Sequence, residues 1–146
     1  MKPVAASADP RNVFAAVPFM QLLGVRREFS HGGRARLVLD ERPEFGNVIG
    51  AVHGGVIVTL LDVVMASAAV SSQDFQRTAV TLNLASSFIG PGRGALTADG
   101  EVMNHDDSIA FCRATVTDAQ GCLVALAHGS FRYLPLPSSP EMETKP

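Results

Sequence analysis

The most constraining feature of this sequence is the apolar stretch at residues 54–72. After Gly55 it contains neither proline nor glycine, and nearly every residue is Val, Ile, Leu, Ala, Met, Ser or Thr. Its length predicts a helix, because strands usually run for three to ten residues. A helix that is apolar on most of its circumference is expected to be buried on most sides. Its longest apolar part, from Val56 to Val70, is interrupted by Asp62 and is shorter than the roughly 20 residues of a membrane span. The stretch is therefore predicted to be a core helix.

The sequence pattern around this helix indicates a sheet. A strand-like run at residues 34–40 precedes it, and four strand-length runs separated by Gly, Pro, Asn or Asp follow it, at residues 79–89, 95–103, 108–117 and 122–134. Residues 10–24 predict a short helical segment kinked at Pro18. This order indicates an α+β fold in which an antiparallel sheet wraps around the central helix. We expect one domain at residues 10–134, a flexible start at 1–9 and a disordered tail at 135–146.

The composition excludes some classes of partner. The formal net charge is −2, which gives no electrostatic reason to expect nucleic acid or an anionic membrane as a partner. No signal-like apolar run occurs near the start, so a cytoplasmic protein is expected.

The two cysteines predict free thiols. Cys112 and Cys122 flank a turn at residues 118–121. In a hairpin closed there, Thr117 is expected to face Cys122 and Cys112 to face about Ala127. The two sulfurs are then roughly 17 Å apart, which is too far for a disulfide.

Asp62 is the first candidate for chemistry. It is the only formally charged residue between Glu44 and Asp74, and it lies in the middle of the most apolar helix. One interpretation is a helix-surface carboxylate or a structural hydrogen bond. The other is a carboxylate in an apolar site, where it serves as a general base or a nucleophile.

The tripeptide His53-Gly54-Gly55 lies where the loop meets the helix. Amide N–H groups in a first helical turn have no partners within the helix, so they suit an oxyanion or a polarised carbonyl. The alternative is a turn that requires glycine, with His53 as a packed or capping residue.

The spacing of these two features constrains how they cooperate. Gly54 and Asp62 are eight residues apart, or about 12 Å along one helix. One helix cannot aim both groups at one carbonyl, whereas two antiparallel copies side by side can. Cooperation therefore predicts a site that crosses a two-fold dimer interface, with two sites per dimer.

The chain resembles the PaaI-like (phenylacetate-pathway type) hotdog thioesterases over about residues 14–134. The resemblance rests on five motifs in the right order: Pro18-Phe19 with Leu23-Gly24; Asn47-x-x-Gly50-x-x-His53-Gly54-Gly55 followed by Asp62 and Ala66; Thr81-x-Asn83-Leu84; Phe88-x-x-Pro91 with Gly94; and the closing hairpin from Gly121 to Phe131.

The resemblance implies a hotdog fold and hydrolysis of an aryl- or fatty-acyl-CoA thioester. It implies that Asp62 is the catalytic carboxylate and that the Gly54 N–H polarises the thioester carbonyl. Asn47 and His53 are then expected to orient the thioester and water, and Thr81 to assist the carboxylate. It further implies no metal and no bound cofactor, CoA being part of the substrate, and a homodimer or a dimer of dimers (homotetramer). Gly55 is expected to contact substrate with Gly54.

One departure concerns the CoA-binding surface. Residues 104–107 read Asn-His-Asp-Asp where the family commonly has Gly followed by Arg or Lys, and Asp106 and Asp107 repel phosphates. Arg93, in a glycine-rich stretch otherwise explained as a turn, or Arg77 is expected to supply the charge instead.

Two other functions remain open from the residues. One is a hotdog hydratase or dehydratase, which pairs His with Asp differently. The other is a non-catalytic module for acyl binding or assembly, favoured only by the acidic replacement at residues 106–107. The choice between a general base and a nucleophile for Asp62 also remains open.

Overall fold

The computed structural model describes Val4 and residues 9–137 of the 146-residue chain. The helical elements are η1 (Pro10–Asn12), α1 (Val13–Ala16), α2 (Pro18–Leu23), η2 (Pro43–Phe45) and α3 (Gly54–Ser71). The strands are β1 (Arg26–His31), β2 (Arg34–Leu39), β3 (Arg77–Phe88), β4 (Leu96–His105), β5 (Ile109–Thr117) and β6 (Leu123–Pro135).

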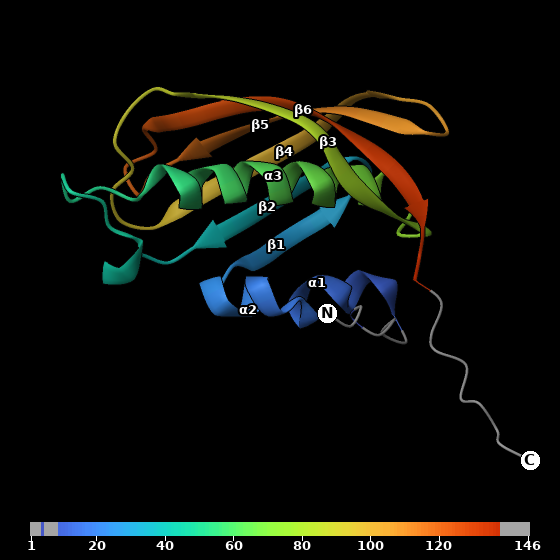
Figure 1. Cartoon of the computed structure of the whole chain (residues 1–146), viewed down its shortest axis with the longest axis horizontal. Helices are drawn as coiled ribbons and strands as arrows, with labels where there is room; N and C mark the ends of the chain where they lie inside the picture. Colours follow the sequence, from blue (N-terminus) through green and yellow to red (C-terminus); the bar gives the residue numbers. More distant parts are fainter. Residues whose placement is uncertain (1–3, 5–8, 138–146) are drawn as a thin grey trace, which may run out of the picture.

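One antiparallel sheet of six strands holds the fold together, in the order β1-β2-β4-β5-β6-β3. It arches over α3, while α1 and α2 lie on the opposite side of α3 from β5 and β6 (Figure 1). Strands β2, β4 and β5 alternate buried and exposed residues, as expected for a sheet with one face on the core. This is the predicted hotdog fold, which is confirmed.

The predicted core helix is also confirmed. Leu61, Val64 and Met65 of α3 are fully buried against the sheet. At Gly100 of β4, an added Cβ would lie 2.8 Å from the carbonyl oxygen of Val64, so this glycine lets helix and strand approach closely. By length and composition alone, α3 could span a membrane. Half of it is buried inside the fold, where it forms the core.

One strand was not predicted. β1 consists of Arg26, Arg27, Glu28, Phe29, Ser30 and His31, which lack a hydrophobic alternation. It is an edge strand with a single partner, β2, so little of its surface needs to be apolar.

The hairpin register around the cysteines also differs from the prediction. Thr117 pairs with Leu123, because Cys122 still belongs to the turn, and Cys112 pairs with Gly129, because the ladder shifts by a further residue between Val116 and Thr117. The expectation that both cysteines are free is confirmed.

The N-terminal helical segment breaks at the predicted proline. Pro18 begins α2, and Val17 before it is extended, with φ −69° and ψ 118°. The tail does not begin where it was predicted, because Pro135 still belongs to β6, opposite Arg77. The expectations of a flexible start and a disordered tail otherwise fall mostly on residues 1–3, 5–8 and 138–146, outside the described residues.

Candidate active site

The first turn of α3 presents one amide N–H without a partner. His53 is the N-cap residue: its Nδ1 accepts a hydrogen bond from the Gly55 N–H at 2.9 Å, and its carbonyl oxygen accepts from Val56 and Ile57. Within the described part of the chain, the Gly54 N–H makes no hydrogen bond. Since Nδ1 is an acceptor here, a neutral His53 carries its proton on Nε2.

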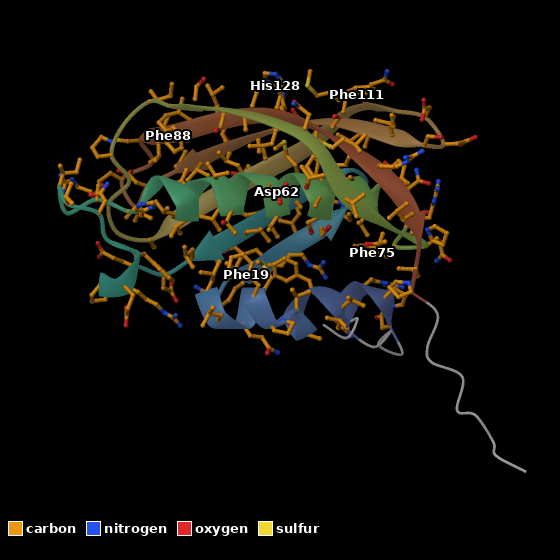
Figure 2. All side chains as sticks on the ribbon, viewed as in Figure 1. Phe19, Asp62, Phe75, Phe88, Phe111 and His128 are labelled. Atoms are coloured by element: carbon orange, nitrogen blue, oxygen red, sulfur yellow. The ribbon has the colours of Figure 1, made fainter. Side chains whose placement is uncertain are left out.

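Phe88 covers this turn. A Cβ added at Gly54 would lie 3.3 Å from Cε1 of Phe88, which is itself 53% exposed. In Figure 2 the labelled Phe88 lies beside the start of α3. The residue forms the end of β3, so the edge strand forms one wall beside the free amide. Its apolar side chain alone did not single it out from the sequence as a site residue.

Asn47 shapes the loop before the helix. Its Oδ1 accepts hydrogen bonds from the Ile49 and Ala51 amides, both at 3.0 Å, so only its side-chain NH₂ is left to donate. Arg93 supports the same loop through a 3.0 Å bond from Nη1 to the carbonyl oxygen of Gly50. Asn47, His53, Gly54 and Arg93 are therefore brought together at the N-terminal end of α3.

Asp62 and Thr81 form the second group. Thr81 Oγ1 donates to Asp62 Oδ1 at 2.6 Å, which joins β3 to the middle of α3. The carboxylate is half-buried, and no Lys, Arg or His within the described residues forms an ion pair with it. One carboxylate oxygen is thus held by a hydroxyl group, and the other is available to a substrate or to water.

A single chain does not bring the two groups together. α3 is continuous from Gly54 to Ser71, so Gly54 and Asp62 are separated by about 12 Å along its axis, as predicted.

The surface around Asp62 is apolar and only partly covered by the described residues of this chain. Val58, Val63 and Ala66 of α3 are only partly buried, and on the adjacent edge strand Val80 and Leu82 are 42% and 52% exposed. β3 pairs only with β6 among the described strands, so its other edge is open. An open edge strand beside an apolar helix face is typical of an interface with another chain.

The acidic pair at residues 106–107 lies away from the free amide. Asp106 accepts hydrogen bonds from the amides of Ser108 and Ile109, which lower the pKa of its carboxyl group. Arg77, which begins β3 next to the end of α3, donates to the carbonyl oxygen of Asp107. The Asp106 side chain therefore caps the β4–β5 turn, and both acids lie at the opposite end of α3 from Gly54.

The residues at the site are not arranged as a metal centre. Over residues 9–137, no group of three or more His, Cys, Asp or Glu side chains is placed to hold a metal ion.

Comparisons with known proteins point to one family. A model described as the Thioesterase superfamily matches residues 49–125. A candidate esterase of Halobacterium salinarum is 30% identical over 124 residues, which cover 77% of this chain and 82% of that protein.

Solved structures agree on the fold. A conserved protein of Pseudomonas aeruginosa has a TM-score of 0.78 and 26% identity, covering 88% of this chain and 100% of its own. The PaaI protein of the phenylacetic acid degradation operon of E. coli has a TM-score of 0.75 and 21% identity, covering 86% and 94%. A hypothetical thioesterase of Streptococcus pneumoniae, solved with coenzyme A, has a TM-score of 0.70 and 21% identity, covering 78% and 88%.

Proposed function

This chain belongs to the thioesterase superfamily, and from that premise we propose that it is a PaaI-like acyl-CoA thioesterase, which hydrolyses an aryl- or fatty-acyl-CoA to free acid and CoA. One observation carries the proposal: the Gly54 N–H has no hydrogen-bond partner among the described residues, and Thr81 holds one oxygen of Asp62. This supports a role for the amide as the donor to the thioester carbonyl and for the carboxylate as the base. The match of the S. pneumoniae protein, solved with coenzyme A, supports the choice of CoA.

The proposed mechanism uses each group once. The Gly54 N–H donates to the thioester carbonyl oxygen and stabilises the negative charge that develops there. Asp62 takes a proton from water as the water oxygen bonds to the carbonyl carbon. The carbon–sulfur bond then breaks, and the proton leaves with the CoA thiolate. Attack by Asp62 itself would instead break the carbon–sulfur bond, release the CoA thiolate and form an anhydride, which water then opens to the free acid and the Asp62 carboxylate.

Two further side chains orient the reactants in this proposal. His53 presents Nε2–H, because its Nδ1 is fixed by the Gly55 amide. Asn47 presents its NH₂ group, because its oxygen is fixed by the loop. Both are donors, which suits a carbonyl oxygen or a water that attacks it. Gly55 gives the substrate access to the backbone, and Arg93 offers a positive charge to the CoA phosphates.

The complete site requires a second chain. The distance between Gly54 and Asp62 along α3 excludes a site within one helix, and the apolar surface around Asp62 supports a two-fold dimer. Each site then combines Gly54 of one protomer with Asp62 of its partner. We further propose a dimer of dimers, a cytoplasmic location, and catalysis without metal or bound cofactor.

A mixed dimer tests the shared site. Asp62→Asn removes the carboxylate, and Gly54→Pro removes the N–H at a helix position that proline favours. Each variant alone is expected to be inactive. A mixed dimer holds one site with both groups intact and one with neither, so co-expression is expected to restore about a quarter of the activity. Sites confined to single chains would restore none.

A thiol-release assay tests the activity itself, over aryl, short, medium and long acyl-CoAs. Asp62→Asn is expected to lower kcat by at least about 10²-fold. The control is Asp40→Asn, which changes an exposed carboxylate paired with Arg26. Failure of the wild type to hydrolyse any thioester, or full activity of Asp62→Asn, would exclude the proposal and favour a binding module.

A further inference from the structure

A cavity of about 430 Å³ lies between α3, the N-terminal helices and the start of β3. Its walls are mainly apolar and include Phe14, Val17, Val63, Ala66, Val70 and Phe75. Val63 and Ala66 belong to the partly buried face of α3 beside Asp62, and the other four residues lie outside the site described above.

The cavity begins beside Asp62. Val63 follows Asp62 in α3, and Ala66 lies one helical turn further along. On the facing strand, Ala79 precedes Thr81 by two residues, so both side chains point to the same face of β3. An acyl group whose carbonyl carbon lies at Asp62 therefore has an apolar space directly next to it.

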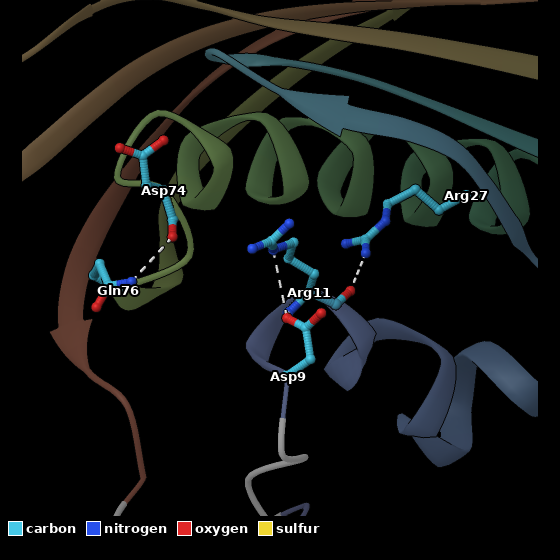
Figure 3. Close-up of polar contacts among 5 residues, drawn as sticks. All are labelled: Asp9, Arg11, Arg27, Asp74 and Gln76. Carbon is cyan, nitrogen blue, oxygen red and sulfur yellow. Dashed lines mark hydrogen bonds and ion pairs between the residues drawn. The ribbon is translucent and has the colours of Figure 1, made fainter.

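One residue that lines this apolar cavity, Arg27, carries a positive charge. The guanidinium of Arg27 lies 5.2 Å from the ring centroid of Phe14 and 5.5 Å from that of Phe75. Its Nη2 donates to the carbonyl oxygen of Arg11, as Figure 3 shows beneath α3. Burial lowers the pKa of Arg27, and the charge of Asp9 opposes this effect.

Arg27 forms no ion pair with a carboxylate of the described residues, although the charge of Asp9 acts on it from a longer distance. Asp9, whose charge raises the pKa of Arg27, forms its own ion pair with Arg11 at 3.5 Å. The second cation of the cavity, Arg77, donates to the carbonyl oxygens of Tyr133 and Asp107. Both arginines that line the cavity are thus bonded to neutral carbonyl oxygens, and its described lining residues include no Asp or Glu.

The backbone is strained where it places Phe75. Asp74 and Phe75 both have positive φ angles, 47° and 60°, in the left-handed region that disfavours residues other than glycine. This turn after α3 directs the Phe75 ring, which is only 8% exposed, against Arg27. Figure 2 shows the labelled Phe75 at the lower side of the end of α3. Strain of this kind persists where the surrounding structure holds it and often marks a functional position.

We propose that this cavity binds the acyl group of the substrate and that Arg27 pairs with a carboxylate at its far end. The preferred substrates are then CoA thioesters of dicarboxylic acids rather than of plain fatty acids. This inference rests on the proposed thioesterase function, and it adds a specificity residue to that reaction. The physical reason is that a half-buried guanidinium with no direct ion pair among the described residues is paired best by a ligand that brings an anion.

Matched substrates test the preference. The full-length protein is assayed with butyryl- and succinyl-CoA, hexanoyl- and adipoyl-CoA, and octanoyl- and suberoyl-CoA. At the length that fits, the wild type is expected to prefer the carboxylated partner by about tenfold or more in kcat/KM, which is the ordinary strength of a charge-assisted hydrogen bond. Arg27→Leu is expected to abolish this ratio while hydrolysis of the plain substrate continues, and Arg27→Lys is expected to keep part of it.

The matched control is Arg26→Leu, which removes the neighbouring arginine of β1. Arg26 is exposed and pairs with Asp40, away from the cavity. Its variant is expected to keep the wild-type ratio. A wild-type protein that hydrolyses plain and carboxylated substrates equally at every length would overturn the inference and leave the thioesterase proposal standing.

A binding measurement separates the two proposals. Calorimetry with Asp62→Asn compares suberoyl-CoA with octanoyl-CoA when no turnover occurs. Tighter binding of suberoyl-CoA that is lost in Asp62→Asn/Arg27→Leu supports the Arg27 contact even if the wild type hydrolyses no thioester. Binding of free octanoate that depends on Arg27, without a preference for suberoyl-CoA, would instead assign the cavity to a free carboxylate ligand and overturn the acyl assignment.

Discussion

Thr81 holds Asp62: its hydroxyl donates to one carboxylate oxygen at 2.6 Å. The donor lies on the edge strand β3 and the acceptor lies in the middle of α3. The strand is irregular directly after Thr81, where Leu82 is left out of the pairing with β6. Such a bulge redirects side chains, and here it follows the residue that donates a hydrogen bond to the carboxylate.

Thr81→Val should therefore lower kcat by about 10- to 100-fold, since a hydrogen bond to a charged group contributes roughly 1.5–3 kcal/mol. Valine keeps the shape but removes the donor. Thr81→Ser keeps the donor and is expected to retain most of the activity. Equal rates for the valine and serine variants in steady-state assays would show that the hydroxyl has no role in turnover.

Two substitutions at Gly54 distinguish the role of its N–H group from the steric effect of a side chain at this position. Gly54→Ala keeps the N–H but places a methyl group 3.3 Å from Phe88, whereas Gly54→Pro removes the N–H. Both are tolerated at the start of a helix, so thermal unfolding should stay within about 1 kcal/mol of the wild type.

We expect Gly54→Pro to lose about 10²-fold or more in kcat, as for the loss of an oxyanion donor. Gly54→Ala should lose less and should recover when Phe88 is replaced by Leu. A fully active Gly54→Pro would remove the amide from the mechanism.

His53 has two separable roles. As the N-cap it accepts the Gly55 amide hydrogen bond, so His53→Ala should cost about 1 kcal/mol in the free energy of unfolding. Asn is a good N-cap, so His53→Asn should recover stability in urea titrations. If the imidazole also orients the substrate, activity will remain low in His53→Asn. Recovery of both properties would limit His53 to a capping role.

The open edge of β3 predicts a variant that dissociates. Leu82→Asp places a charge on the exposed apolar surface beside Asp62, where a partner chain would bury it. Light scattering should show a monomer with a native circular dichroism spectrum and no thioesterase activity. Met103→Asp is the control, because Met103 is equally apolar and 62% exposed but lies on β4, away from the β3 edge. An active monomeric Leu82→Asp would contradict the shared site.

The two cysteines should behave differently with pH. Burial raises the pKa of Cys112 from 9.0 to about 12, whereas Cys122 is exposed. The unfolded chain loses the Cys112 proton first, so folding stability should fall as the pH rises from about 9 to about 12. Urea unfolding should show a smaller fall for Cys112→Ala than for Cys122→Ala. A thiol reagent should label only Cys122 in the native protein.

The sequence predicted the parts of the fold that have strong local signals. The apolar run at residues 54–72 predicted α3, and the turn residues between apolar runs predicted β3 to β6. It did not predict β1, because an edge strand needs few apolar residues. It also missed the hairpin register, since the irregularity at Val116 and Thr117 depends on contacts across the sheet.

The candidate site was predictable in part for the same reason. The spacing of Gly54 and Asp62 along one helix is a local quantity, so their separation was predictable before the structure. The cavity at Arg27 was not, because it is assembled from β1, α1, α3 and β3, which are distant in sequence. No local pattern distinguishes Arg27 from the exposed Arg26 beside it.

The half-covered α3 has a consequence for how the protein is made and handled. The chain supplies enough sheet to bury only one side of its most apolar helix. When a second molecule covers the other side, the apparent stability rises with protein concentration by mass action. Dilution would then loosen the structure itself as well as slow the reaction. Newly synthesised chains would likewise be exposed to aggregation and proteolysis until they meet one another.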